Sequence, residues 1–210
     1  MRILVAAVLL LFAGALAATD APVAAPLVEN AKLATLFAQD QAARSGSDID
    51  WAAMSKADAA RREQVQAMLA AGTVRSANDY YHAAMVFQHG DTLADFRLAN
   101  ALATLAMQLD SGNEHYRWLA GASWDRLLMR QMQPQWYGTQ YKGDARGMYL
   151  FPVASDAVSD AERTAMVGHT LAESLAHLAT AASEMGLPVR NPAPTLETLR
   201  EEAAAANLDH

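Results

Sequence analysis

Two histidines and one aspartate in apolar segments are the residues of this sequence best suited to acid–base chemistry. His82 and His89 lie in the segment DYYHAAMVFQHG, and Asp125 lies in a second apolar segment rich in leucine and tryptophan. A neutral imidazole accepts a proton near neutral pH, and a carboxylate can hold it in the required orientation. We therefore predict His82, His89 and Asp125 as the catalytic candidates of an enclosed polar site.

Further polar side chains in the same segments could bind a ligand. An arginine, Arg44 or Arg126, would supply a fixed cation for an anionic group, and glutamine amides would donate hydrogen bonds. The predicted ligand-binding residues are Asp40, Gln41, Arg44, Gln88, Arg126, Gln135, Tyr137, Thr139 and Gln140.

The spacing of the two histidines argues against a metal pair. Seven residues separate His82 from His89, so their Cα atoms would lie about 10.5 Å apart along a helix. A zinc pair on one helix uses positions i and i+3 or i+4. The chain has no cysteine and no G-x-S-x-G elbow, so a nucleophile is also not evident. No metal is predicted, and the cofactor is left open.

Helix caps and apolar spacing predict an all-α fold that would position these side chains. We expect a compact array of antiparallel helix hairpins, about six helices in all, with one inserted aromatic β-hairpin or ordered loop. The expected helices begin near Pro26 and at Ser55, Ser76, Thr92, Asn113 and Ser159, the last of them continuing to Gly186, and a final exposed helix begins at Thr195.

The segment 131–158 departs from the helical pattern. Two aromatic runs, Trp136–Tyr141 and Met148–Val153, flank the polar turn Lys142–Gly147 and predict two strands of a hairpin or an ordered loop. Long connections in compact domains are often functional. A hairpin that only covers the open end of a helical core is an equally good interpretation.

Charged residues interrupt otherwise apolar helices. Asp125 and Arg126 fall on a helix that is apolar nearly all round, so both should be partly buried and need partners. They point about 100° apart and need not pair with each other. Asp40 and Arg44 form an i, i+4 pair. Arg61 shares an apolar stripe, whereas the neighbouring Arg62 is expected to pair with Asp58. Purely structural salt bridges and satisfied core histidines are the alternative to a site.

The amino terminus has the pattern of a secretory signal peptide. Arg2 precedes the apolar run Ile3–Phe12, and Ala15–Ala17 offers a small-x-small cleavage motif. We expect residues 1–17 to be a signal peptide, 18–26 a flexible lead-in, 27–186 a single helical domain and 187–210 a linker with the tail helix. The protein would be exported, with the periplasm preferred over the extracellular space and no membrane span after cleavage.

The charge of the chain disfavours nucleic acid as a partner. The 210 residues include 16 Lys and Arg against 23 Asp and Glu, and no basic stripe is evident. An acidic protein repels a phosphate backbone.

Several of these segments together resemble a bacterial family known only as a domain of unknown function. The motifs are DQxxR at Asp40–Arg44, DYYHAAMVFQHG at Asp79–Gly90, WLAxxxxDRxL at Trp118–Leu128 and QWYGTQ at Gln135–Gln140. The similarity covers roughly Leu36–Gly168. Where relatives tend to have a glycine, this chain has Met132. The resemblance implies no activity.

Two functions fit these observations. The first is an enclosed polar site that binds or hydrolyses a small anionic ligand. The second is a non-catalytic periplasmic helical module that binds a peptide or protein partner. Convergence of His82, His89, Asp125 and Gln140 on one pocket would favour the first, and dispersal into separate contacts would favour the second.

Overall fold

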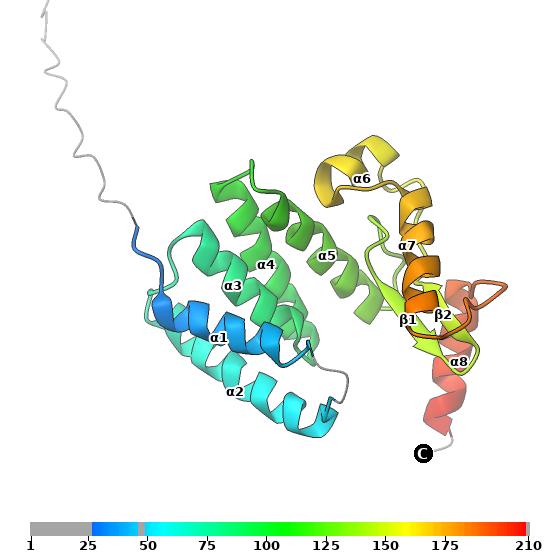
Figure 1. The fold of residues 1–210 in the computed structure, drawn as a ribbon, viewed down its shortest axis with the longest axis horizontal. Coiled ribbons are helices and arrows are strands. Elements are labelled where there is room, and N and C mark those ends of the chain that lie inside the picture. Colours follow the sequence, from blue (N-terminus) through cyan, green and yellow to red (C-terminus); the bar gives the residue numbers. More distant parts are fainter. Residues whose placement is uncertain (1–26, 46–48, 209–210) are drawn as a thin grey trace, which may run out of the picture.

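A computed structural model describes residues 27–45 and 49–208. The expected signal peptide and the whole of the expected lead-in lie outside the described residues. The described residues form eight helices and one antiparallel two-stranded hairpin, so the all-α prediction with an inserted hairpin is confirmed (Figure 1). The elements are α1 (Ala31–Ala42), α2 (Trp51–Ala70), α3 (Ala77–Gln88), α4 (Leu93–Leu109), α5 (Glu114–Arg130), β1 (Tyr141–Asp144), β2 (Gly147–Leu150), α6 (Asp160–Val167), α7 (Leu171–Glu184) and α8 (Leu196–Leu208).

Local capping chemistry sets the start of the central helices. Ser76 and Thr92 each form a capping box with the aspartate three residues later, and Asn113 accepts a hydrogen bond from His115 N. These three predicted starts are confirmed. The cap satisfies main-chain N–H groups that have no acceptor inside the helix.

Two predicted helix starts are wrong by about one turn. The side chain of Asn30 caps α1, four residues after Pro26, and accepts from Leu33 N. Asp50 caps α2 by accepting from Ala53 N, so Ser55 lies inside that helix. In both cases an Asn or Asp side chain supplies the acceptor for a main-chain N–H group three residues later.

The predicted long helix from Ser159 to Gly186 is two helices. Gly168 adopts φ +83°, a left-handed conformation that ends α6. Thr170 then forms a capping box with Glu173 and starts α7. This second capping box lies inside an apolar periodic segment, which is why the pattern predicts one helix.

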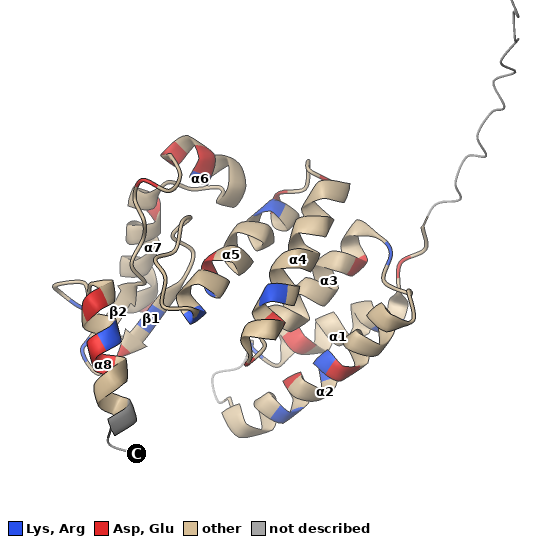
Figure 2. Cartoon of the chain, turned by 180° about the vertical axis from the view of Figure 1, so that it is seen from behind, with Lys and Arg blue, Asp and Glu red and all other residues tan. Residues whose placement is uncertain are grey.

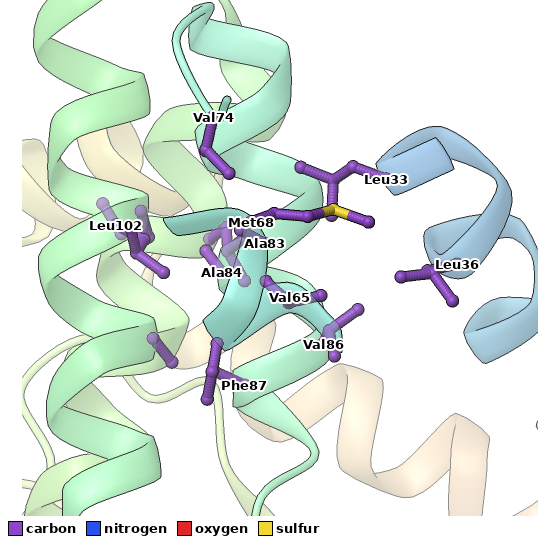
Figure 3. Close-up of a cluster of buried hydrophobic side chains, with 14 residues drawn as sticks. Leu33, Leu36, Val65, Met68, Val74, Ala83, Ala84, Val86, Phe87 and Leu102 are labelled. Carbon is purple, nitrogen blue, oxygen red and sulfur yellow. The ribbon is translucent and has the colours of Figure 1, made fainter. Parts of the chain in front are cut away.

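Helices α1–α5 pack around one apolar core. Figure 3 shows its central side chains, with Leu33 and Leu36 of α1 facing Val65 and Met68 of α2. Alanines of α3 and α4 are fully buried there and allow close approach of these two helices. Figure 1 shows α5 between this array and the part formed by the hairpin and α6–α8.

The hairpin packs between two helices. Met148 and Leu150 face Leu178 of α7, whereas Tyr149 and Phe151 on the other face contact Leu199 of α8. Alternate residues of a strand point to opposite faces, so one short strand serves two helices. The tail helix is therefore docked through Leu199, which is buried, while most of its other described side chains are exposed.

Candidate functional site

Asp125 organises the loop that follows α5. Its side chain is fully buried, and Oδ1 accepts hydrogen bonds from the N–H groups of Trp136 (2.8 Å) and Tyr137 (3.0 Å). Oδ2 accepts from Thr139 N (3.1 Å) and Thr139 Oγ1 (2.9 Å). Burial raises the pKa of Asp125, while the four donors act in the opposite direction. The predicted strand from Trp136 is therefore a loop, because its N–H groups bind a carboxylate instead of a neighbouring strand.

Gln135 closes the base of the hairpin. Its Nε2 donates to the carbonyl oxygens of Gln140 (3.0 Å) and Phe151 (2.7 Å), and its Oε1 accepts from Gln140 N (2.8 Å). The residue is completely buried and all three bonds are to main chain. Gln135 is thus committed to the loop, as Asp125 is.

Met132 marks the turn before this loop. It adopts φ +53°, in the left-handed region that favours glycine. The methionine side chain packs beside the cluster of Tyr149, Phe151 and Leu199.

Asp40 lies at the centre of a second polar network, between α1, α2 and the end of α3. The carboxylate is fully buried and accepts from Arg44 Nη1 (2.9 Å), Gln41 Nε2 (2.8 Å) and His89 Nδ1 (2.8 Å). The predicted Asp40–Arg44 pair is confirmed. Four of the predicted site residues meet here, joined by charges on α2.

The partners on α2 differ from those expected. Asp58 binds Arg44 Nη2 at 2.6 Å and Arg61, and these two guanidinium groups hold the pKa of Asp58 below its usual range despite burial. Arg62 instead pairs with Asp91 at 2.7 Å, so the predicted Arg62–Asp58 pair is wrong. Arg61 is buried on the apolar face of α2, as predicted. Asp58 is buried on the same face, so Arg61 and not Arg62 pairs with it. The network contains two carboxylates and two guanidinium groups, and is balanced in charge.

His82 lies apart from both networks. Its ring stacks on Phe37 with centroids 4.3 Å apart and also contacts Tyr81. Burial lowers the pKa of His82, although Glu29 and Asp79 act in the opposite direction. The imidazole is therefore a neutral part of an aromatic cluster.

The four side chains whose convergence would indicate one catalytic pocket are dispersed. His82 stacks on Phe37, His89 binds Asp40, and Asp125 binds the loop. Gln140 binds Arg126. Tyr137 and Thr139 contact Asp125 chiefly through their main-chain N–H groups, and Tyr137 places no side-chain donor on it. The three catalytic candidates do not share a site.

Arg126 is a largely desolvated cation that has no counter-ion among the described residues. Its Nε donates to Gln140 Oε1 at 2.9 Å and its Nη1 to the carbonyl oxygen of Gln88 at 3.3 Å. No carboxylate of the described residues lies within 4.0 Å of it, and Asp125, its neighbour in sequence, points elsewhere. Burial lowers the pKa of Arg126 to about 10, with Arg130 and Arg44 acting in the same direction. A desolvated cation among other cations is an unfavourable arrangement for the protein alone.

A recess of about 230 Å³ opens beside this guanidinium, where the C-terminal end of α5 faces β1 (Figure 2). Arg126 Nη2 has no hydrogen-bond partner within the described part of the chain. It is also not one of the side-chain nitrogen or oxygen atoms that are fully buried without a partner. The recess is lined by Gly90, Phe96, Arg126, Met129, Arg130, Gln140, Tyr141 and Lys142. Three of these side chains are cationic and none is acidic.

The other two cations of the recess were not predicted. Arg130 lies over the Phe96 ring, 4.8 Å from its centroid, and Lys142 is exposed and forms no ion pair with any described residue. Asp91 and Asp95 are neighbours in sequence of the recess residues Gly90 and Phe96, but both form ion pairs with Arg62. The sequence could have indicated Arg130, because Arg126 and Arg130 are an i, i+4 pair of like charge and no acidic residue lies on the same face of the helix. Lys142 lines the recess because of the position of the hairpin, and no sequence pattern predicts that position.

The described residues contain no group of three or more His, Asp or Glu side chains that could hold a metal ion. None of the helices in this part of the chain is long and apolar enough to span a bilayer. Gln88, the remaining predicted ligand-binding residue, donates weakly to Ala122 O and leaves its buried Oε1 without a partner.

Comparison with known proteins gives no match: no family model, no curated protein and no solved structure is significantly similar to this chain.

Proposed function

We propose that this protein binds a small anionic ligand in the recess beside Arg126. The observation that carries the proposal is a partly buried guanidinium group that lines the recess, has no carboxylate partner among the described residues and leaves Nη2 without a hydrogen bond. Arg126 belongs to the ligand-binding residues predicted from the sequence, together with Gln140 and Gln88.

The energetics favour an anion in this recess. A buried charge without a partner costs several kcal/mol, and that cost is offset when a counter-ion binds. Arg126, Arg130 and Lys142 all contribute positive charge, although the whole chain has a net charge of −7. Local concentration of one sign of charge in a concave site attracts ligands of the opposite sign.

The chemistry of the lining restricts the ligand to a compact oxyanion. A guanidinium donates parallel N–H groups that match carboxylate and phosphate oxygens. A water molecule occupies about 30 Å³ of liquid volume, so a recess of about 230 Å³ accommodates one phosphate or carboxylate group with a few waters. Phe96 and Tyr141 leave room for only a small apolar part next to the anionic group.

Binding has more support than catalysis. His82, His89 and Asp125 are each engaged in separate contacts with the protein, and none of them lines the recess. Export to the periplasm, which the amino-terminal pattern predicts, is part of the same proposal.

A thermal-shift titration tests this function. The wild-type protein is heated in the presence of sodium phosphate, sulfate, acetate or citrate, each matched in ionic strength with sodium chloride. A ligand that binds only the folded state stabilises it by mass action, by about 2.7 kcal/mol at one hundred times its Kd. We expect a saturable rise in Tm with at least one oxyanion. Identical Tm values in all matched solutions would contradict the proposal.

A further inference from the structure

The outer edge of β2 is only partly used by the protein. Met148 donates its N–H to Pro188 O and accepts from Arg190 N, both at 2.8 Å, on the side away from β1. Leu150 lies two residues after Met148 on β2, and it pairs with Tyr141 of β1. Residues two apart on a strand direct their N–H and C=O groups to the same side. Leu150 therefore presents its main-chain groups to the same outer edge.

Within residues 27–45 and 49–208, no chain segment forms main-chain hydrogen bonds with that edge at Leu150. Phe151, the next residue, donates in the opposite direction to Gln140 O at 3.0 Å, which agrees with this alternation. No described main-chain group pairs with Leu150 on the outer side. After Arg190 the chain turns away at Asn191 and Pro192, so the parallel pairing that begins at Met148 stops one step before Leu150.

A pocket of about 590 Å³ lies where the pairing stops. One wall is α7, with Leu171, Leu175 and Leu178, and the floor is the chain from Tyr149 to Val153. The opposite wall is the turned-away segment from Val189 to Pro194. This volume is within the range of pockets that hold a ligand or a few side chains.

The charge of the pocket selects the occupant. Arg190 is the one charged residue of its lining, and its guanidinium is paired with Asp144 at 2.6 Å and with Glu202 at 2.8 Å. The remaining lining is almost entirely apolar, so the pocket complements an uncharged apolar side chain. Unpaired main-chain groups beside it complement another peptide backbone.

We propose that this pocket binds an extended, uncharged peptide segment that continues the parallel pairing begun by Pro188–Arg190 along β2. The peptide backbone exchanges hydrogen bonds with Leu150, and an apolar side chain enters the pocket against α7. Addition of a strand to an open sheet edge gives affinity through the main chain and selectivity through the side-chain pocket. The proposal is independent of the anion recess, because the two sites share no lining residue.

The probe is the capped peptide acetyl-Thr-Val-Thr-Leu-Thr-Val-Thr-amide, titrated into the uniformly ¹⁵N-labelled full chain and followed by NMR. We expect saturable shifts of the Leu150 amide at up to about 1 mM peptide, the weak end of specific binding. Exchange of this amide with solvent should slow at the same time. The same peptide N-methylated at its five central residues keeps every side chain but loses the N–H groups, and its affinity should fall at least about tenfold.

Two matched variants place the site. Leu175 is half exposed and lines the pocket, so Leu175→Glu should keep the fold and weaken the peptide at least about tenfold. Leu105 is similarly exposed on α4 but lies outside the pocket, so Leu105→Glu should bind as wild type.

Three results would overturn the proposal. The first is no saturable shift of the Leu150 amide. The second is equal affinity for the N-methylated peptide, which would show an apolar site without strand pairing. The third is a shift of that amide with protein concentration alone, which would make a second copy of this chain the occupant of the edge.

Discussion

At the scale of single residues, Asp125 shows how a buried carboxylate can define a loop. It accepts hydrogen bonds from three main-chain N–H groups and one hydroxyl, and no solvent reaches it. These donors could not bond to water if the carboxylate were lost. The side chain is therefore as important for the conformation of Trp136–Thr139 as a strand partner would be.

Replacement of Asp125 by asparagine should destabilise the protein by about 2 kcal/mol or more, because an amide nitrogen would face donors and leave them unsatisfied. Urea denaturation followed by circular dichroism measures this loss. Asp156→Asn is the control, since Asp156 is exposed and its substitution should stay within about 0.5 kcal/mol of wild type. Equal stability of the two variants would refute this role of Asp125.

His82 should make stability depend on pH. Its pKa is lowered in the folded protein by burial, so the unfolded chain takes up a proton more readily. Stability is then fully present above the ordinary histidine pKa of about 6.5 and falls as the pH drops towards the folded-state pKa. His169, whose pKa is also lowered by burial and by His177, acts with the same sign.

Urea denaturation between about pH 7 and pH 5 should therefore show a declining free energy of unfolding, by at most about 1.4 kcal/mol per pH unit for each histidine. His82→Phe keeps an aromatic ring stacked on Phe37, and it should remove the contribution of His82 to the pH dependence of the free energy of unfolding. The exposed His115 provides the control, His115→Gln, which should leave the slope unchanged. An unaltered slope in His82→Phe would contradict the assignment.

At the scale of elements, Gly147 fixes the hairpin against the segment that leads to α8. It has φ +122°, and an added Cβ would lie 2.3 Å from the carbonyl oxygen of Pro188. Both the backbone conformation and the close approach require glycine. The contact allows Met148 to bond Pro188 and Arg190 on the outer edge of β2.

Gly147→Ala should destabilise the hairpin by more than about 1 kcal/mol, since strain and a main-chain clash add together. Hydrogen exchange of the Met148 and Arg190 amides should become faster. Gly143→Ala is a matched substitution in the same hairpin, at a position without positive φ. An added Cβ there would lie 3.8 Å from the Met148 side chain, an ordinary contact distance. Gly143→Ala should leave the hydrogen exchange of the Met148 and Arg190 amides unchanged. Similar effects of both substitutions would show that positive φ and the contact with Pro188 are not the reason for glycine at position 147.

Capping chemistry explains which elements can be predicted from the sequence. Ser76, Thr92 and Asn113 act through atoms two or three residues away, so a local pattern is sufficient. The division of the last long helix at Gly168 and Thr170 uses the same chemistry but lies within a continuous apolar periodicity. Strand β1 begins only at Tyr141, the end of the first aromatic run, because a side chain of α5 binds the N–H groups earlier in that run. The strand then continues to Asp144, so most of the predicted turn Lys142–Gly147 belongs to the hairpin strands and the predicted bounds of the turn are wrong.

At the scale of the whole molecule, the site depends on contacts between segments that are far apart in the sequence. Apolar surroundings correctly predict that Asp125 is buried. The angle of about 100° between successive helix positions allows Asp125 and Arg126 to have different partners, as they do. They cannot predict which loop satisfies Asp125. They also cannot show that Lys142 completes a cationic recess with Arg126, because that depends on the register of the hairpin against α5.

The arrangement of charge over the molecule has the same origin. Asp40 and Asp58 neutralise Arg44 and Arg61 between α1 and α2, while Arg126 has no carboxylate partner among the described residues. A charge that the fold could have neutralised but did not is the physical reason to expect an external anion. The central claim of this account is therefore that Arg126 binds a ligand and does not primarily stabilise the fold.

Isothermal titration of phosphate into wild type, Arg126→Met and Arg97→Met tests that claim most directly. Arg97 is an exposed arginine outside the recess and serves as the matched control. We expect wild type and Arg97→Met to bind phosphate equally, and Arg126→Met to lose binding at least about tenfold while its free energy of unfolding falls by no more than about 1 kcal/mol. Phosphate binding by Arg126→Met with wild-type affinity would contradict the account.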